Sequence, residues 1–488
     1  MNSDTRSPIG FLPAGWKLDS LKNITTKIGS GSTPRGGEAA YLEERIEYAF
    51  IRSQNVLDFQ FSESEVKYIS DSDANKLKNV HLQRDDLLLN ITGDGITFGR
   101  CCIVPEEILP AAVNQHVSII RLDQEKCLPG YLLAYLCLPQ IKEYISNFNA
   151  GGSRRAITKG HIETFDIPLP PMSIQRSIQR FTFDVMHKVR ANTQLNQNLE
   201  KIAQAIFKSW FVDFEPTKAK IAAREALQAE KPDATPEQIS TAEQQAAIQA
   251  IAGAGDVIPT EQLQTIADLF PKQMVNSELG EIPEGWSAQP FGSQADILRG
   301  FSYKGKGLVN ECSESVPMHN LNSILEGGGY KYSGLKHYSE EFKDKFRVEV
   351  GDLFVANTEQ GHNHLLIGYG AMVPKHLAHG FFSHHLYRIR PNKAAVLSPE
   401  YISYLFKKGR FVRQVQGFTN GTTVNMLPID GLKLPLCIVP NKQLVHCFSE
   451  SVKPMHELIE KNTINNERLE SMRDLLLPKL LSGELING

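Results

Sequence analysis

Four short polar segments in the first 170 residues carry side chains that proteins use to read base edges and to hold phosphates. Arg pairs with guanine, Asn and Gln pair with adenine, and hydroxyl groups bind phosphate oxygens. The segments are 29–35, 90–100, 114–116 and 151–155, and three of them contain glycines that permit close approach. The candidate contact residues are Ser32, Thr33, Arg35, Thr92, Arg100, Asn114, Gln115, His116, Ser153, Arg154 and Arg155.

A comparable set of polar residues recurs in the second half of the chain. Its members are Arg299, Tyr303, Lys304, Lys306, Asn357, Thr358, Gln360, His384, His385, Thr422 and Thr423. For any single residue, a solvated loop side chain is the simpler interpretation. The prediction of a nucleic-acid surface therefore depends on the set as a whole.

Motifs for other chemistries are incomplete. The segment 300–307 nearly fits a phosphate-binding loop, but that loop requires Ser or Thr after its Lys, and Gly307 has no hydroxyl. The histidines of 361–364 and 384–385 have no Cys or carboxylate at ligand spacing. The sequence also lacks a nucleophile with a paired base and the Asn-Pro-Pro-aromatic motif of amino-methyltransferases. We therefore expect that the chain is not an enzyme and holds no metal.

Composition is that of a folded protein with more than one domain. The 488 residues are 41% hydrophobic and 22% charged, with a net charge of -3. No apolar run reaches the about 18 residues of a membrane helix, and residues 1–10 do not resemble a signal peptide, so we expect a cytoplasmic protein. The seven cysteines lack CxxC spacing and are expected to be reduced structural thiols. The small net charge disfavours an indiscriminate polycation, although charge can be local.

The elements that must position these side chains occur twice. Residues 12–16, Leu-Pro-Ala-Gly-Trp, return 270 residues later as Ile-Pro-Glu-Gly-Trp at 282–286. The same offset relates Asn192-Thr193 to Asn462-Thr463. Between these anchors only isolated matches remain, such as 85–88 with 351–354 and 114–116 with 383–385. Constant ends around divergent interiors indicate two related modules with different working faces.

Each module is predicted to be a mixed domain of short strands and a few helices, an α+β fold. Residues 46–51, 87–91 and 117–121 are β-like. Segment 129–136 is predicted to form a helix that starts with Pro-Gly, and 399–405 is its copy. Each module ends in a proline-rich segment, 167–171 or 434–436, that we expect at a sheet boundary because proline cannot donate in a central ladder.

A long helix follows each module, over roughly 173–210 and 441–482. Apolar residues at spacings of four and three form a heptad seam with polar residues at matching places, which fixes register in coiled coils. The residues predicted to pair the two helices are Asn192, Leu199, Ile206, Asn462, Leu469 and Leu476. The alternative is that each helix packs on its own domain, which Pro454 and Arg473 favour locally because they interrupt the pattern.

Residues 215–280 have no counterpart in the second half. The segment is rich in Ala, Gln and Glu, and Thr235-Pro236-Glu237-Gln238 predicts a helix start with a capping box. A tether of short helices is one interpretation, and a docking surface for a partner is the other.

This pattern resembles the specificity subunit of Type I restriction-modification enzymes. The resemblance is carried by the repeated Leu/Ile-Pro-x-Gly-Trp and by 167–171, Ile-Pro-Leu-Pro-Pro, before a helix. It also rests on three further motifs: Ser-Trp-Phe-Val-Asp-Phe at 209–214, 277–283, and Leu-Pro-Lys-Leu-Leu-Ser-Gly-Glu-Leu at 477–485. It covers nearly all of 12–485 except 215–280.

The resemblance implies two target-recognition domains held apart by two antiparallel helices. The implied divisions are a first domain at 1–171, a first spacer helix at 172–214, a helical linker at 215–280, a second domain at 281–440, and a second helix with the C-terminal tail at 441–488. Each domain reads one half of a split double-stranded DNA target.

The resemblance also implies that the partners of the chain perform the chemistry. They are two methyltransferase subunits that use S-adenosylmethionine, and restriction subunits that translocate DNA with ATP and magnesium. Two alternatives remain open. The first is a two-module protein-interaction scaffold without DNA recognition, and the second is a fused methyltransferase or nuclease, which the missing motifs disfavour.

Overall fold

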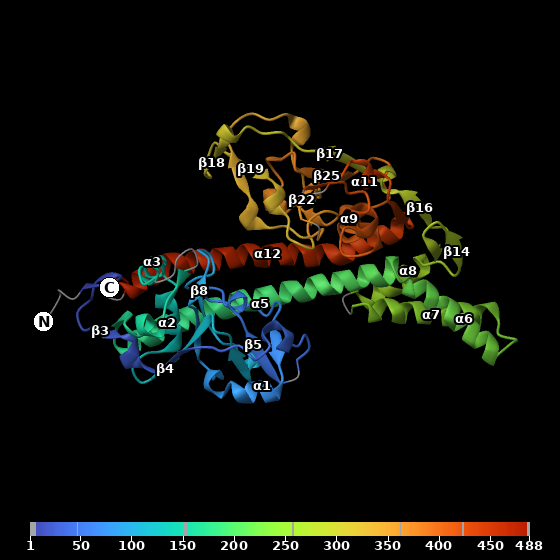
Figure 1. The fold of residues 1–488 in the computed structure, drawn as a ribbon. Helices are drawn as coiled ribbons and strands as arrows, with labels where there is room; N and C mark the ends of the chain where they lie inside the picture. Colours follow the sequence, from blue (N-terminus) through green and yellow to red (C-terminus); the bar gives the residue numbers. More distant parts are fainter. Residues whose placement is uncertain are drawn as a thin grey trace. The chain divides into compact units, whose positions relative to one another are not determined.

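The computed structural model describes residues 6–45, 47–149, 155–255, 258–361, 363–421 and 424–485 (Figure 1). The chain divides into two compact units. Unit 1 contains Met1–Thr193 and Thr463–Gly488, and unit 2 contains Gln194–Asn462. Each unit combines small sheets with long helices, which confirms the predicted α+β class.

A four-stranded antiparallel sheet in the order β4-β11-β7-β9 forms the centre of unit 1. Both of its faces are buried, and successive side chains along a strand enter opposite core clusters. Leu87 and Leu89 point into one core cluster, which includes helix α2, whereas Leu88 points into the cluster shared with the sheet β10-β5-β6. The strands of unit 1 are β1 (Arg6–Ser7), β2 (Gly10–Phe11), β3 (Lys17–Ser20), β4 (Thr25–Ser30), β5 (Tyr48–Ile51), β6 (Lys67–Ile69), β7 (Leu87–Asn90), β8 (Thr92–Gly93), β9 (Cys101–Ile103), β10 (Ala111–Val113), β11 (Val117–Leu122), β12 (Arg155–Ala156) and β13 (Asp166–Leu169).

Unit 2 repeats this topology. Its central sheet has the order β17-β25-β21-β23, and a second sheet pairs β19 with β24 in parallel as β5 pairs with β10. We call residues 6–171 domain 1 and residues 281–440 domain 2. The strands of unit 2 are β14 (Met274–Ser277), β15 (Gly280–Pro283), β16 (Ser287–Pro290), β17 (Ala295–Arg299), β18 (Leu308–Val309), β19 (Val316–His319), β20 (Lys336–Tyr338), β21 (Leu353–Ala356), β22 (Thr358–Gln360), β23 (Gly370–Met372), β24 (Phe381–Phe382), β25 (Leu386–Pro391), β26 (Val424–Met426) and β27 (Leu436–Val439).

Two of the short helices lie where the sequence predicts them. The predicted helix and its copy are observed as α2 (Pro129–Leu136) and α9 (Pro399–Leu405), each with its proline in the first turn. The proline-rich ends form β13 and β27, each in a two-stranded sheet rather than a central ladder. The other short helices of the domains are α1 (Asp71–Lys76), α3 (Pro139–Ser146), α4 (Lys159–Glu163), α10 (Arg410–Gln416) and α11 (Asp430–Lys433).

Two helices of 40 residues, α5 (Met172–Phe211) and α12 (Lys442–Leu481), each contribute to both units. Helix α12 continues through Pro454. In unit 2, Asn462 donates to Asn196 at 2.9 Å, and the rings of Phe207 and Phe448 lie 5.7 Å apart, so the two segments run antiparallel.

In unit 1, Asn192 donates to Asn466 at 2.8 Å. This hydrogen bond between side-chain amides is the equivalent of the Asn462–Asn196 hydrogen bond in unit 2. Arg473 does not interrupt the seam there, because its guanidinium lies 4.0 Å from the ring centroid of Phe59. At the end of α12 the pattern shifts by one residue. Leu477 is buried in the core of domain 1, whereas Leu476 is only half-buried.

The segment without a counterpart forms α6 (Glu215–Glu230), α7 (Pro236–Gly253) and α8 (Thr260–Leu269). The predicted capping box is confirmed, because Thr235 accepts from the Gln238 amide and Gln238 accepts from the Thr235 amide. The buried Lys220 donates to the carbonyl oxygens of Ala267 and Phe270 at 2.7 and 2.6 Å, which satisfies the C-terminal end of α8.

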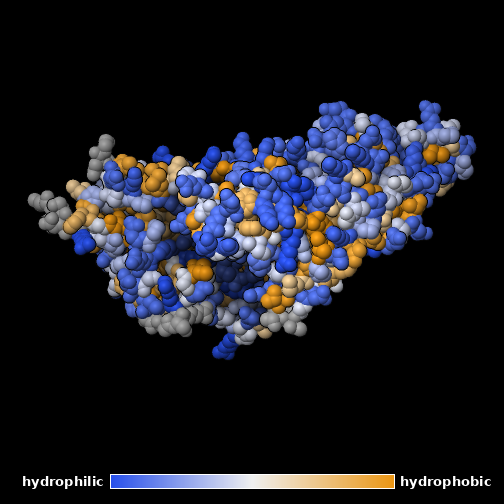
Figure 2. Space-filling model, turned by 90° about the horizontal axis from the view of Figure 1, so that it is seen from above, coloured by the Kyte–Doolittle hydropathy of each residue, from blue (hydrophilic) through white to orange (hydrophobic). Residues whose placement is uncertain are grey.

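On the face of the molecule drawn in Figure 2, hydrophobic and hydrophilic residues are interspersed. Within the described part of the chain, no helix is long and apolar enough to cross a membrane. All seven cysteines are free, and the neighbours Cys101 and Cys102 point into opposite core clusters of the central sheet.

Candidate nucleic-acid interface

The polar loops gather at one end of the central sheet in each domain, where β4 or β17 ends and β11 or β25 begins. Gly31 and Gly300 mark this point. A Cβ on Gly31 would lie 2.1 Å from the carbonyl oxygen of Val113, and one on Gly300 would lie 2.2 Å from that of Ser383. Both positions therefore require glycine, which lets the chain leave the sheet directly over the neighbouring backbone.

A threonine and a histidine meet at this end of both domains. The Thr92 hydroxyl lies 2.6 Å from His116 Nδ1, and the Thr358 hydroxyl lies 3.1 Å from His385 Nδ1. Each threonine begins the short strand β8 or β22, and each histidine comes just before β11 or β25. We call these two contacts the Thr–His pairs.

In domain 1 the pair belongs to a chain of hydrogen bonds. The Thr33 hydroxyl donates to Gln115 Oε1, and Gln115 Nε2 lies 3.4 Å from His116 Nε2. Ser32 and Arg35, in the same loop as Thr33, are exposed. The structure therefore links four of the predicted residues, Thr33, Thr92, Gln115 and His116, which come from three separate loops of the sequence.

The other predicted residues of domain 1 have different environments. Asn114 is buried and its side chain accepts from the His116 amide, so it shapes the loop. Arg100 is half-buried and lies near Asp94, and backbone hydrogen bonds from Thr97 and Ile96 lower the pKa of that carboxyl together with the Arg100 charge. Arg155 is exposed on β12 and donates to Ser146 at 2.9 Å. Ser153 and Arg154 lie outside the described residues.

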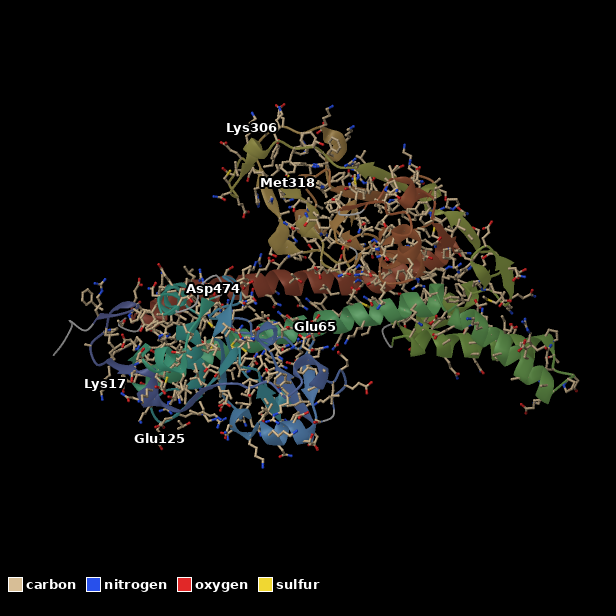
Figure 3. All side chains as sticks on the ribbon, in the orientation of Figure 1. Lys17, Glu65, Glu125, Lys306, Met318 and Asp474 are labelled. Atoms are coloured by element: carbon tan, nitrogen blue, oxygen red, sulfur yellow. The ribbon has the colours of Figure 1, made fainter. Side chains whose placement is uncertain are left out.

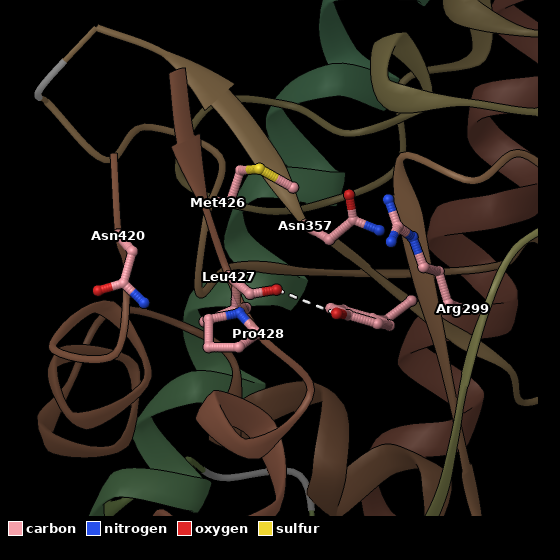
Figure 4. A pocket seen from close by; sticks show the side chains of 7 residues that line it. Arg299, Asn357, Asn420, Met426, Leu427 and Pro428 are labelled. Carbon is pink, nitrogen blue, oxygen red and sulfur yellow. Dashed lines mark hydrogen bonds between the residues drawn. The ribbon is translucent and has the colours of Figure 1, made fainter. Parts of the chain in front are cut away.

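In domain 2 the equivalent surface contains Arg299, whose Nε donates to the carbonyl oxygen of His384 at 3.2 Å. The Asn357 amide donates to the same oxygen at 2.8 Å and is buried, so it holds the loop in place. Arg299 and Asn357 line a pocket together with Tyr387, Asn420 and Met426 (Figure 4). The Tyr387 hydroxyl donates to Leu427 O at its floor.

Rings cluster beside this pocket. The rings of His384 and His385 lie 4.0 Å apart, and the ring of Tyr303 lies 6.1 Å from that of His384. Burial, His384 and the Arg299 charge all lower the pKa of His385, so its imidazole is neutral near pH 7. His384 Nδ1 and Asn357 Oδ1 are buried without a hydrogen-bond partner among the described residues.

The remaining predicted residues of domain 2 are peripheral or undescribed. Lys304, Lys306 and Gln360 are exposed, and Lys306 forms an ion pair with Glu340 at 3.0 Å at the edge of the domain (Figure 3). Thr422 and Thr423 lie outside the described residues.

Sequence reasoning missed two carboxylates that shape the loops next to the pairs. Asp94 accepts from the amides of Ile96 and Thr97, and Ile96 is 72% exposed at the tip of the β8–β9 connection. In the equivalent β22–β23 connection, the buried Glu359 accepts from three successive amides beginning at Leu365. The Asp-Gly pair at 94–95 is typical of a turn, so the role of Asp94 could have been predicted from the sequence. The role of Glu359 could not, because no local motif links it to the amides that begin six residues later.

Comparisons with known proteins agree with this architecture. Residues 13–201 match the family model of the Type I restriction modification DNA specificity domain. The chain is 26% identical over 497 residues to the Type I restriction enzyme HindI specificity subunit of Haemophilus influenzae, covering 96% of this chain and 99% of that one. It is 22% identical to the MjaIX specificity subunit of Methanocaldococcus jannaschii, covering 98% and 95% of the two chains.

A solved structure has the same fold over nearly the whole chain. The S subunit of a Type I restriction-modification system from M. genitalium superposes with a TM-score of 0.50 at 12% identity, covering 97% of this chain and 98% of that one. The chain thus shares the fold of that S subunit. The chain is therefore similar over nearly its whole length to specificity subunits of Type I restriction-modification enzymes, and residues 13–201 match their DNA specificity domain.

Proposed function

We propose that this chain is the DNA-recognition subunit of a Type I restriction-modification complex, in which each domain reads one half of a bipartite target. The observation that carries the proposal is the pairing of one scaffold with two different surfaces. The central sheets have the same strand order, and the Thr–His pairs lie at the same end. Around them, domain 1 presents Thr33 and Gln115, whereas domain 2 presents Tyr303 and His384.

The chemistry of these surfaces supports base reading. Domain 1 offers an amide and hydroxyls, which suit base edges, and an exposed Arg35, which suits guanine or a phosphate. Domain 2 offers Arg299 beside a pocket and stacked imidazoles. Different donors on the same scaffold would give different half-sites.

We further propose that α5 and α12 set the unread gap between the half-sites and carry two methyltransferase subunits. The chemistry would then belong to partners, which would use S-adenosylmethionine for methylation and ATP with magnesium for translocation and cleavage. Among the described residues, no cluster of His, Cys, Asp and Glu offers a metal site in this chain. We propose the cytoplasm as the location of the complex, because its proposed substrate is chromosomal DNA.

A protein-interaction scaffold without DNA recognition explains these surfaces less well. Such a scaffold would need apolar patches that bury on docking, but the shared sheet end is lined mainly by amide, hydroxyl, imidazole and guanidinium groups. The family match concerns a DNA specificity domain as well.

Methylation mapping tests the proposal. Genomic DNA from cells that express this chain with its methyltransferase partner is compared with DNA from cells that lack only this chain. A split methylated motif that depends on the chain is the expected result. An unchanged methylation pattern, with both proteins present and folded, would contradict the proposal. The purified chain alone should transfer no methyl group.

A further inference from the structure

The Thr–His pairs are the polar feature that the two domains share at this surface, while their surroundings differ. The residue before the histidine is Gln115 in domain 1 and His384 in domain 2. Across the neighbouring strand, Thr92 is paired with Ala156, whereas Thr358 is paired with Met426. Neither threonine and neither histidine is fully buried, so core packing does not require the pair.

A feature common to two readers of different sequences must contact something common to both half-sites. The bases of the half-sites differ, but the sugar-phosphate backbone does not. We infer that the Thr92 and Thr358 hydroxyls, oriented by His116 and His385, each donate to a backbone phosphate and set the register of their domain on DNA. This inference rests on the proposed function and deepens it.

The hydrogen-bond chain of domain 1 sets the direction of the donors. The Gln115 amide can only donate to His116 Nε2, so this nitrogen accepts and the ring proton is on Nδ1. Nδ1 then donates to the Thr92 oxygen at 2.6 Å, and the Thr92 hydroxyl proton is directed elsewhere. A hydroxyl held in this way is a donor for an anionic oxygen.

Domain 2 supports the same arrangement with different neighbours. The Thr358 hydroxyl lies 3.1 Å from His385 Nδ1, the same ring nitrogen as in the first pair, and burial and the neighbouring charges lower the pKa of His385, which favours a neutral ring near pH 7. The exposed Arg299 guanidinium, anchored through Nε to the His384 carbonyl oxygen, adds positive charge beside the pair. Each histidine is thus a positioning residue that acts through its threonine.

The test uses the full chain in complex with its methyltransferase partner and duplexes that contain the mapped bipartite motif. Thr92→Val removes the hydroxyl and keeps the shape, so we expect affinity to fall about tenfold, the value of one hydrogen bond to a charged group. The loss should be the same for the cognate duplex and for duplexes with altered bases in the first half-site. Thr358→Val should behave likewise for the second half-site.

Duplexes with a single methylphosphonate locate the phosphate. At one position in the first half-site, neutralising the phosphate should weaken binding of the wild-type chain and remove the difference between wild type and Thr92→Val. Thr26→Val is the matched control, because Thr26 is an exposed threonine at the opposite end of β4 from the pair and should show no such coupling. His116→Asn should weaken binding in the wild-type background but add little to Thr92→Val.

Three results would overturn the inference. A change in the preferred bases after Thr92→Val would make the pair a base reader. Coupling to no phosphate, together with additive effects of His116→Asn, would make it a structural contact. Absence of sequence-specific binding by the wild-type complex would contradict the proposed function itself and therefore this inference as well.

Discussion

Arg190 on α5 and Glu460 on α12 occupy equivalent positions 270 residues apart, and each binds its own domain with the opposite charge. In unit 1, Arg190 pairs with Glu107 at 2.6 Å and Glu63 at 3.2 Å. In unit 2, Glu460 pairs with His376 at 2.7 Å. Glu107 and His376 lie in equivalent helical turns, Glu106–Ile108 and Lys375–Leu377. The acidic turn of domain 1 would be repelled by a glutamate such as Glu460, so the charges match each domain to its own helix.

Glu460→Gln should weaken domain attachment more than Arg190→Gln. The Glu460 carboxylate accepts from the amides of Lys375 and His376 as well as from the imidazole, so its loss should cost about 1–2 kcal/mol of local stability. Arg190 is half-exposed and makes only side-chain ion pairs, so its loss should cost under about 1 kcal/mol. Hydrogen exchange at Lys375 and His376 measures the first effect.

The control for this comparison is exchange in the turn Glu106–Ile108 of the Arg190→Gln variant. It should accelerate less than exchange at Lys375–Leu377 does in Glu460→Gln. Equal acceleration in both variants would show that the backbone hydrogen bonds to Glu460 contribute nothing.

The paired asparagines predict a difference between single and double substitutions. Asn192→Leu leaves the Asn466 amide with one partner fewer in a half-buried site and should cost about 1–3 kcal/mol in urea unfolding. Asn192→Leu with Asn466→Leu removes both groups and should recover most of that stability while loosening the helix register. Leu195→Ala, at a 42% exposed position, should change stability little. A double variant less stable than the single one would contradict a register role.

Helix insertions test the proposal for the gap. The same seven residues, about two helical turns or 10 Å, are inserted into α5 before Leu199 and into the paired stretch of α12. The half-sites should stay unchanged, and the mapped gap should lengthen by about one to three base pairs. An insertion in only one helix should disturb pairing and reduce activity. An unchanged gap in a well-folded double insertion would rule out the helices as its determinant.

Sequence alone predicted the repeated scaffold well, because the signals are local. Two helix starts could be predicted from the Pro-Gly of 129–136 and the Pro of 399–405. The heptad positions of the asparagines at 192 and 462 indicated the helix pairing. It predicted less of the surface. Asn114 and Asn357 resemble base readers in sequence but are buried, and only the fold shows that their amides hold loops. The pairing of Thr92 with His116 depends on sheet register, which one sequence does not specify.

Arg155→Ala should relax one half-site. Arg155 is exposed on β12 opposite Gly93, one position from the Ala156–Thr92 pairing, so it lies on the same two-stranded ribbon as the first Thr–His pair and extends from the opposite face of that ribbon. If it contacts a base, its loss should reduce discrimination at one position of the first half-site by about tenfold and leave the second half-site unchanged. Methylation mapping with a limiting concentration of the complex measures discrimination at the first and at the second half-site. Arg154→Ala together with Arg155→Ala should enlarge the effect without loss of partner binding; lost assembly would place these arginines in a protein interface instead.

Acid should destabilise domain 2 through His319. This histidine is fully buried on β19, with Nδ1 accepting from Tyr330 at 2.8 Å, and burial lowers its pKa to about 4. The unfolded chain has a histidine pKa of about 6.5 and binds the proton first, so stability is full above that pH and falls as the pH drops toward 4, by about 3 kcal/mol. Urea unfolding of domain 2 as a function of pH should show this loss. His319→Gln should be less stable at pH 7 but should lose much less between pH 6.5 and 4. Ile51 occupies the equivalent position in domain 1, which should therefore lack this dependence; the same acid loss in His319→Gln would assign it to other groups.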